Sequence, residues 1–180
     1  MTDIKEGNII LIGMPGSGKS TIGVLLAKAL GADFTDTDLL IQRRAGMLLK
    51  DIISHRGTDG FLDYEAEILL SLNIRGAVIA TGGSAVCREG VIDSLKSGGI
   101  SVWLDVPLNL LEERIGGLEG LRARGVALGD DQSLRGVYEK RRELYIKNAD
   151  IRAECGELNA EGCCALLLSR LSAFKAKLRE

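Results

Sequence analysis

Residues 13–20, Gly-Met-Pro-Gly-Ser-Gly-Lys-Ser, are the stretch around which the rest of this chain can be arranged. They fit the pattern G-x-x-x-x-G-K-S/T, which is typical of a phosphate-binding loop. A strand-like apolar run precedes the motif at residues 8–12, and a helix-like run follows it at residues 21–30. An ordinary glycine-rich turn at a helix start is the simpler alternative, but it does not require all these residues in register. The sequence therefore predicts a nucleoside triphosphate site.

Each residue type in the loop suits this chemistry. The glycines allow successive backbone N–H groups to point inward as an anion-binding nest, and the N-terminus of the following helix adds partial positive charge. We expect Lys19 to reach the β- and γ-phosphates and the Ser20 hydroxyl to hold Mg²⁺ beside them. The residues predicted to bind the nucleotide here are Gly13, Gly16, Ser17, Gly18, Lys19, Ser20 and Thr21.

Composition favours one compact domain, because 180 residues with 46% hydrophobic and 27% charged side chains are ordinary for a globular protein. The 23 basic and 25 acidic residues give a net charge of −2, which provides no general attraction to nucleic acid or an anionic membrane. No apolar stretch approaches the roughly 20 residues of a membrane span, and residues 1–7 do not resemble a signal peptide. We expect a cytoplasmic monomer without nucleic-acid or membrane partners.

The four cysteines lack paired C-x-x-C spacing, and no histidine cluster accompanies them, since His55 is the only histidine. We expect reduced, mostly buried thiols rather than a zinc site, and a surface or capping position for His55.

Alternating strand-like and helix-like segments predict parallel βαβ units in a three-layer α/β/α sandwich with a central parallel sheet. The expected strands are residues 8–11, 33–35, 77–80, 101–106 and 150–153, and the main expected helices are residues 19–30, 39–44, 48–54, 59–72, 88–96, 132–148 and 159–178. We expect the helices within about 38–72 to bind the substrate. Residues 116–131 are rich in glycine, arginine and charge, so they are expected to form a mobile lid rather than a packed element.

Ligands of open parallel sheets bind beyond the carboxyl ends of the strands. The phosphate loop, residues 36–38 and residues 81–83 all follow predicted strands, so we expect them to converge. Phosphoryl transfer needs Mg²⁺ and a group that orients the attacking oxygen. Asp36 is the candidate metal ligand, and Asp38 is the candidate to accept a substrate hydroxyl's hydrogen bond and its proton. A simpler reading makes Asp38 the N-cap of a helix that begins at Leu39.

Arginines would neutralise charge on the moving phosphoryl group. Arg122 and Arg124 lie within the predicted lid, and Arg141 and Arg142 lie on the helix after it. A solvated surface position is the alternative for each.

Five groups of residues together resemble the shikimate kinase family over almost the whole chain. They are the phosphate loop with residues 34–38, Gly60-Phe61 with Glu65, residues 80–83, residues 141–145, and Ala149-Asp150. The resemblance implies a fold like that of nucleoside monophosphate kinases. It also implies transfer of the γ-phosphoryl group from ATP, with Mg²⁺, to the 3-hydroxyl of shikimate.

The resemblance carries over to single positions of this sequence. Lys19, Asp38 and Arg124 would be catalytic, with Arg124 reaching the ATP phosphates from the lid. Ser20 and Asp36 would lie at the metal, and Arg114 would lie against adenine. Asp38, Gly82, Gly83 and Arg141 would bind the acceptor, with Arg141 holding its carboxylate.

Three positions depart from the family pattern. Leu62 replaces an arginine that is a second grip on the substrate carboxylate, which would remove about 1.5–3 kcal/mol of charged hydrogen bonding. Ser84 replaces a third glycine in the pocket, and residues 122–128 replace the usual lid sequence after a short insertion.

The departure at Leu62 leaves two hypotheses for the acceptor. In the first, the protein is a shikimate kinase in which Arg43, Arg44 or Arg56 binds the substrate carboxylate in place of the missing arginine. In the second, a paralogue with the same ATP machinery phosphorylates another hydroxylated acceptor, such as homoserine or a sugar acid. A nucleoside monophosphate kinase and a nucleotide-binding module without turnover are further alternatives. The aspartate pair and the lid arginines argue against the module, and the Gly82-Gly83 backbone suits hydroxyls or a carboxylate better than a base.

Overall fold

The structure, a computed structural model, describes residues 7–128 and 133–177. Its centre is a parallel sheet of five strands in the order β2-β3-β1-β4-β5. The strands are β1 (Ile9–Ile12), β2 (Asp33–Asp36), β3 (Ala77–Ala80), β4 (Ile100–Asp105) and β5 (Ile151–Glu154). Every residue of β1, β3 and β4 is buried, as expected for parallel strands that are covered on both faces.

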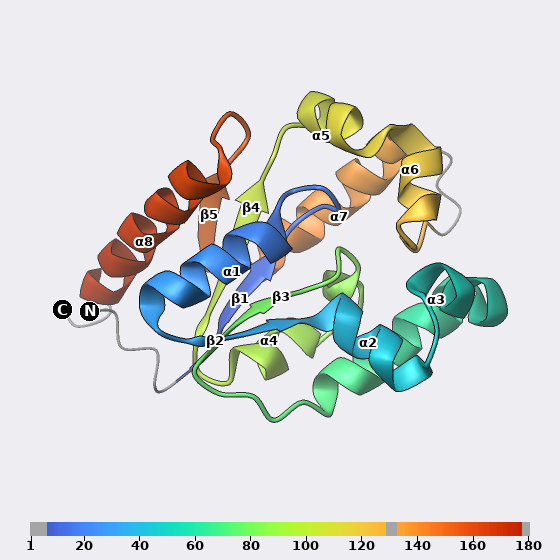
Figure 1. Cartoon of the computed structure of the whole chain (residues 1–180), viewed down its shortest axis with the longest axis horizontal. Helices are drawn as coiled ribbons and strands as arrows, with labels where there is room; N and C mark the ends of the chain where they lie inside the picture. The colour runs from blue at the N-terminus through green and yellow to red at the C-terminus, as the bar shows by residue number, and fades with distance from the viewer. Residues whose placement is uncertain (1–6, 129–132, 178–180) are drawn as a thin grey trace.

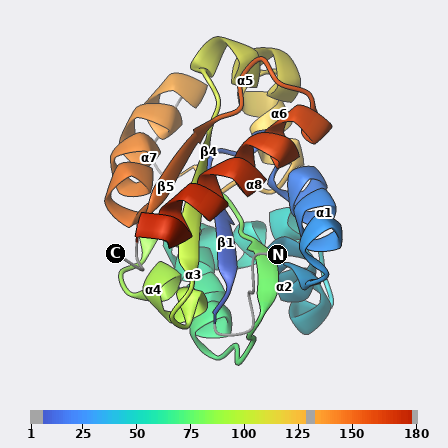
Figure 2. The same cartoon turned by 90° about the vertical axis from the view of Figure 1, so that its left-hand side faces the viewer.

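Helices cover the two faces of this sheet. They are α1 (Lys19–Leu30), α2 (Thr37–Ala45), α3 (Leu49–Leu70), the short 3₁₀ helix η1 (Ala85–Cys87), α4 (Val91–Lys96), α5 (Leu108–Ile115), α6 (Gly117–Ala123), α7 (Leu134–Asn148) and α8 (Ala160–Lys177). Helices α1 and α8 pack together on one face, and α4 and α7 lie on the other (Figure 1). Figure 2 shows α8 crossing the sheet beside α1. The predicted three-layer sandwich with a central parallel sheet is therefore confirmed.

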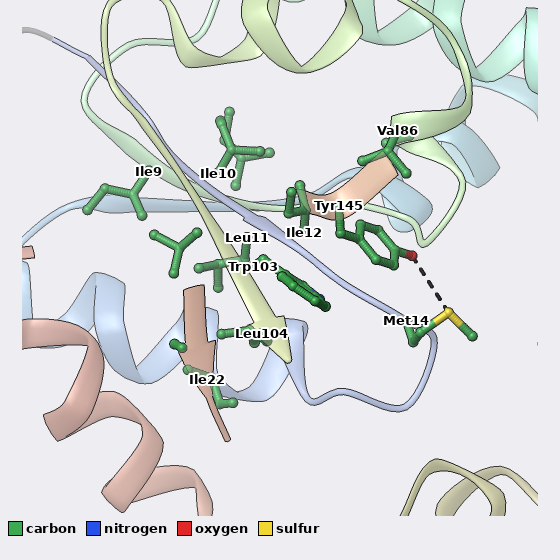
Figure 3. Packing of buried hydrophobic residues seen from close by; sticks show 14 of the residues in the cluster. Ile9, Ile10, Leu11, Ile12, Met14, Ile22, Val86, Trp103, Leu104 and Tyr145 are labelled. Atoms are coloured by element: carbon green, nitrogen blue, oxygen red, sulfur yellow. Dashed lines mark hydrogen bonds between the residues drawn. The ribbon is translucent and has the colours of Figure 1, made fainter. Parts of the chain in front are cut away.

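Strand β1 lies at the middle of the sheet, between β3 and β4, and it leads directly into the phosphate loop. Its four residues lie in the main apolar core, which also contains Trp103 of β4 and Tyr145 of α7 (Figure 3). The Trp103 and Tyr145 rings stack with their centroids 6.0 Å apart. This packing holds the loop against a rigid platform.

A second apolar cluster lies between α2 and α3 and includes a residue from the end of the predicted lid segment. Its buried members are Ile41, Leu49, Ile52, Phe61, Leu62, Ile68 and Ala127. Helix α3 bends at Gly57, whose φ of 70° lies outside the helical region. The break predicted between residues 54 and 59 is therefore confirmed, because two helical segments meet at this kink.

The predicted lid segment differs from the expectation that it is unpacked. Residues 117–123 form helix α6, and the Leu121 side chain is completely buried in the main core. One leucine at the right position is enough to anchor a short helix that is otherwise glycine-rich and charged. The expected mobility stays a prediction, and residues 129–131 of the segment lie outside the described residues.

The cysteines and His55 lie close to where the sequence predicted them. Of the cysteines, Cys155, Cys163 and Cys164 are buried free thiols and Cys87 is partly exposed, while His55 lies on the surface. Across residues 7–128 and 133–177, no helix combines the length and apolar character that a bilayer crossing requires. Expectations for residues 1–6, 132 and 178 lie outside the described residues.

Candidate active site

The phosphate loop joins β1 to α1, and its lysine is folded back onto the loop itself. Lys19 Nζ donates hydrogen bonds of 2.8 Å to the carbonyl oxygens of Gly13 and Met14. Burial lowers the pKa of Lys19 to about 8, although nearby Asp38 opposes the shift. The ammonium group is therefore charged at neutral pH and is available to an anion that enters the loop.

Gly13 shows why this position excludes a larger residue. Its φ of 145° is unfavourable for an L side chain, and a Cβ atom there would lie 2.8 Å from the Leu104 carbonyl oxygen. The loop therefore passes close to the end of β4. Gly13 and Ser17 form the inner wall of the loop rather than the surface of the cavity.

The two predicted metal ligands lie side by side. Ser20 Oγ donates to Asp36 Oδ2 over 2.6 Å. Asp36 Oδ1 accepts from the backbone N–H groups of Asp38 and Leu39 at 3.0 and 3.3 Å. A hydroxyl and a carboxylate are hard oxygen ligands of the kind that Mg²⁺ prefers, so this donor pair fits the ion.

The same contacts correct the alternative reading of Asp38 as a helix cap. Helix α2 begins at Thr37, and the capping side chain is Asp36. Asp36 thus takes the structural role, because its position at the end of β2 points it at the free N–H groups of α2. The Asp38 carboxyl remains available to the cavity, which it lines.

Asp38 lies against Gly82, which follows β3. A Cβ atom at Gly82 would lie 2.5 Å from Asp38 Oδ1 and 2.7 Å from Glu65 Oε1, so two carboxyl groups flank one glycine. Burial, followed by the charge of Asp36, raises the pKa of Asp38 to about 6. Asp38 is therefore largely ionised at neutral pH, yet basic enough to accept a proton.

Two hydrogen bonds from other elements hold the turn at residues 82–84. Gly82 N donates to Thr37 Oγ1 at 3.1 Å, and the Tyr145 hydroxyl donates to the Gly83 carbonyl oxygen at 2.8 Å. The same hydroxyl lies 3.9 Å from Met14 Sδ of the phosphate loop (Figure 3). Tyr145 thus links the predicted acceptor turn to the predicted nucleotide loop.

Arg141 is buried beside this turn, with only 5% of its surface exposed. Its Nη2 donates to the carbonyl oxygen of Ala127, at the end of the predicted lid segment. Its Nη1 is buried and has no hydrogen-bond partner among the described residues. An unsatisfied buried guanidinium N–H is costly, so this atom is suited to an anionic ligand.

Of the remaining predicted arginines, Arg114 and Arg124 contact each other. Arg124 Nη2 donates to the Arg114 carbonyl oxygen at 3.2 Å, and Arg114 Nη2 donates to the Gly156 carbonyl oxygen at 3.0 Å. In contrast, Arg122 lines a separate surface cavity, and Arg142 lies near Glu143.

A cavity of about 350 Å³ connects these groups. Its lining includes the predicted site residues Gly16, Gly18, Lys19, Ser20, Thr21, Asp38, Gly82, Gly83, Arg114, Arg124 and Arg141. Leu62 is not part of the lining and packs into the apolar cluster between α2 and α3. The cavity therefore combines a phosphate-binding end with an end that offers a carboxylate, backbone groups and one guanidinium.

None of the three arginines proposed to replace the missing grip lines this cavity in the described part of the chain. Arg56 lies over the Tyr64 ring at 4.3 Å, and Arg44 donates to Ser71 Oγ at 2.9 Å. Arg43 lines a different cavity, beside Asp36. The hypothesis that one of them takes over the carboxylate therefore has no support in this arrangement.

Sequence reasoning assigned no role to Glu65, Ser84 or Tyr145, although all three lie at the acceptor end. Glu65 is 2% exposed, and burial raises its pKa to about 7. The place of Glu65 in the family pattern after Gly60-Phe61 was the available signal. Tyr145 also lies in that pattern, within residues 141–145, but its contact with residue 83 depends on the packing of α7.

Comparison with known proteins agrees with this geometry. A family model described as shikimate kinase matches residues 15–172. A shikimate kinase from Symbiobacterium thermophilum is 36% identical over 167 residues, which cover 91% of this chain and 95% of the relative. The solved structure of a shikimate kinase from Acinetobacter baumannii in complex with shikimate has a TM-score of 0.80 and 30% identity, and covers 93% of each chain. The shikimate kinase structure from Aquifex aeolicus has a TM-score of 0.77 and 32% identity, and covers 92% of this chain and 96% of that one. On these grounds, this chain belongs to the shikimate kinase family.

Proposed function

We propose that this protein transfers the γ-phosphoryl group of ATP to the 3-hydroxyl of shikimate. The observation that carries the proposal is the shared cavity, which Lys19, Asp38 and Arg141 all line. The relatives named shikimate kinase, and the solved relative in complex with shikimate, support this choice of acceptor.

The proposed mechanism relies on positioning and charge neutralisation. Lys19 and Arg124 meet the negative charge on the phosphoryl group, and Arg114 lies against adenine. Asp38 Oδ1, which faces Gly82, accepts the proton of the attacking hydroxyl. Ser20 and Asp36 hold Mg²⁺, which when bound neutralises phosphate oxygens.

At the acceptor end, we infer that the backbone around Gly82 and Gly83 binds the acceptor and that Arg141 Nη1 holds its carboxylate. We also infer that residues 116–131 close over the cavity as a lid and that residues 38–72 form the substrate-binding side of a single domain. Close packing of Gly125, in the lid segment, against Leu49 of α3 supports the inference that residues 38–72 form the substrate-binding side. A monomeric, cytoplasmic enzyme without nucleic-acid or membrane partners stays a prediction.

A paralogue with another acceptor is the second candidate, because one specific observation favours it. Arg141 is the only guanidinium among the described residues that lies beside the Gly82–Ser84 turn and lines the cavity, since Leu62 is buried among apolar side chains. A single arginine binds a carboxylate with lower affinity than a pair of arginines does.

The experiment that tests the function measures coupled ADP release with Mg-ATP and a panel of acceptors. The panel contains shikimate, homoserine, gluconate and nucleoside monophosphates, and the native protein is compared with Leu62→Arg. We expect the native protein to turn over shikimate best. If another acceptor is preferred, or if shikimate is used only by Leu62→Arg, the proposed acceptor is wrong.

Arg141→Lys is expected to raise the KM for shikimate about 10-fold to 100-fold while leaving the KM for ATP within about threefold. The reason is that a lysine cannot both hold the Ala127 carbonyl and donate to a carboxylate in the fixed geometry of Nη1, which removes about 1.5–3 kcal/mol. Steady-state kinetics in both substrates measure the effect. Arg142→Lys, on the same helix, is the matched control. Equal increases in both KM values would show that Arg141 supports the whole site instead.

A further inference from the structure

Ser84 lies at the acceptor end of the cavity, next to the residue that faces Arg141. Its side chain lines the cavity, and only 6% of the residue is exposed. A Cβ atom at the preceding Gly83 would lie 3.2 Å from Arg141 Nη1. Ser84 thus directly follows the glycine that lies beside the guanidinium proposed to hold the acceptor carboxylate.

Glu65 lies behind Ser84. The Ser84 side chain interacts with the Glu65 carboxyl and favours its ionised form, and Glu65 is only 2% exposed. One of its carboxyl oxygens, Oε1, faces Gly82 and has no hydrogen-bond partner among the described residues. A buried carboxyl oxygen without a partner costs free energy of folding. The contact with Ser84 therefore offsets part of the cost of burying Glu65.

Helix α3 supplies no cation to pair with Glu65. The residue one turn earlier on the same face is Leu62, which packs in the apolar cluster with Phe61. The titratable groups that face Glu65 from other elements are Asp38 of α2, Cys87 of η1, and Arg141 and Tyr145 of α7. Of these, Arg141 alone carries positive charge, and no ion pair joins it to Glu65 in the described residues.

We propose that Ser84, oriented by Glu65, is a specificity-determining residue that donates a hydrogen bond to the acceptor carboxylate beside Arg141. The pair thereby provides the second carboxylate contact that Leu62 cannot make. This inference rests on the proposed function, because it assumes an acceptor with a carboxylate.

The direction of the hydrogen bonds gives this arrangement a pH dependence. A neutral Glu65 donates its proton to Ser84 Oγ, which leaves the Ser84 hydroxyl proton free for the acceptor carboxylate. An ionised Glu65 accepts that proton instead and adds a buried negative charge near the carboxylate. Because the pKa of Glu65 is raised to about 7, the favourable form is present below pH 7 and is lost as the pH rises. The KM for the acceptor should therefore rise above pH 7.

The test measures kcat and both KM values from pH 6 to 9 for the native protein, Ser84→Ala and Glu65→Gln. Ser84→Ala is expected to raise the KM for shikimate about tenfold at pH 6.5, with the KM for ATP unchanged. The native KM for shikimate should increase roughly tenfold between pH 6.5 and 8.5. Glu65→Gln, whose amide can still donate to Ser84 but cannot ionise, should keep the low KM across this range.

Matched controls separate a local role from a general loss of structure. Glu67→Gln changes an exposed glutamate on the same helix, and Ser94→Ala changes an exposed serine on α4. Both should keep the native KM values and thermal midpoint. A lower thermal midpoint with equal changes in both KM values for Ser84→Ala would show a purely structural role and overturn the inference.

Two further outcomes are distinguishable. If the native protein does not turn over shikimate, the proposed function fails, and this inference fails with it. If the native protein turns over shikimate and Ser84→Ala has the same KM and pH profile, only the role of Ser84 is wrong. Loss of the native pH dependence in Ser84→Ala but not in Glu65→Gln would also contradict the role given to Glu65.

Discussion

Lys19→Ala is expected to lower kcat by at least about 100-fold, because preorganised charge at the phosphoryl group is among the largest contributions to this kind of catalysis. Lys19 Nζ is buried at the base of the loop, 2.8 Å from two carbonyl oxygens, and it is largely protonated at neutral pH because its pKa is about 8. No other lysine among the described residues lines the cavity. Alanine at this position therefore leaves the γ-phosphate without its closest cation.

Coupled ADP release at saturating ATP and shikimate measures this effect. Lys28→Ala is the matched control, since Lys28 lies exposed in the last turn of the same helix. Thermal melting of both variants checks that the loop remains folded. Native turnover in Lys19→Ala would contradict the assignment of residues 13–20 as the catalytic phosphate-binding loop.

Asp38→Asn is expected to reduce kcat by about 10²–10⁴-fold, with the affinity for ATP changed by less than about threefold. The substitution retains the shape of the side chain but removes its ability to accept a proton. Since Asp36, not Asp38, caps α2 and contacts Ser20, the loss should not extend to the helix or the metal ligands. Kinetics combined with direct titration of ATP binding separate the two quantities.

Asp33→Asn provides the control, because Asp33 is an exposed aspartate on the same strand as Asp36. It should behave like the native protein. If Asp38→Asn weakens ATP binding as much as it lowers kcat, the residue supports the nucleotide site or its metal and is not the proton acceptor.

The phosphate loop and the alternation of strands and helices were readable from local pattern alone. The loop spacing is set by the ligand that it must surround, and buried parallel strands need continuous apolar runs such as residues 9–12. These constraints act between residues close in sequence. The same is true of the glycines, lysine and serine of the motif, whose identities follow from the phosphate chemistry.

Helix boundaries and caps were less predictable, because neighbouring residues compete for the same role. Both Asp36 and Asp38 suit an N-cap by residue type, and the turn after β2 gives that role to Asp36. The helix at residues 117–123 was missed because its composition is typical of a loop, whereas one buried leucine, Leu121, holds it in the core.

The acceptor end depends on contacts between segments far apart in sequence, and no local pattern encodes them. Tyr145 reaches residue 83 across 62 positions, and Arg141 reaches Ala127 through the packing of α7 against the end of the lid segment. The orientation of Leu62 into an apolar cluster, away from the cavity, is likewise a result of how α2 and α3 pack. Sequence was sufficient for the fold and for the nucleotide end of the site because both follow from short-range spacing and periodicity. The partners of Glu65, Ser84 and Arg141 required the folded chain, because burial and long-range packing determine which polar atoms meet and which remain available to a ligand.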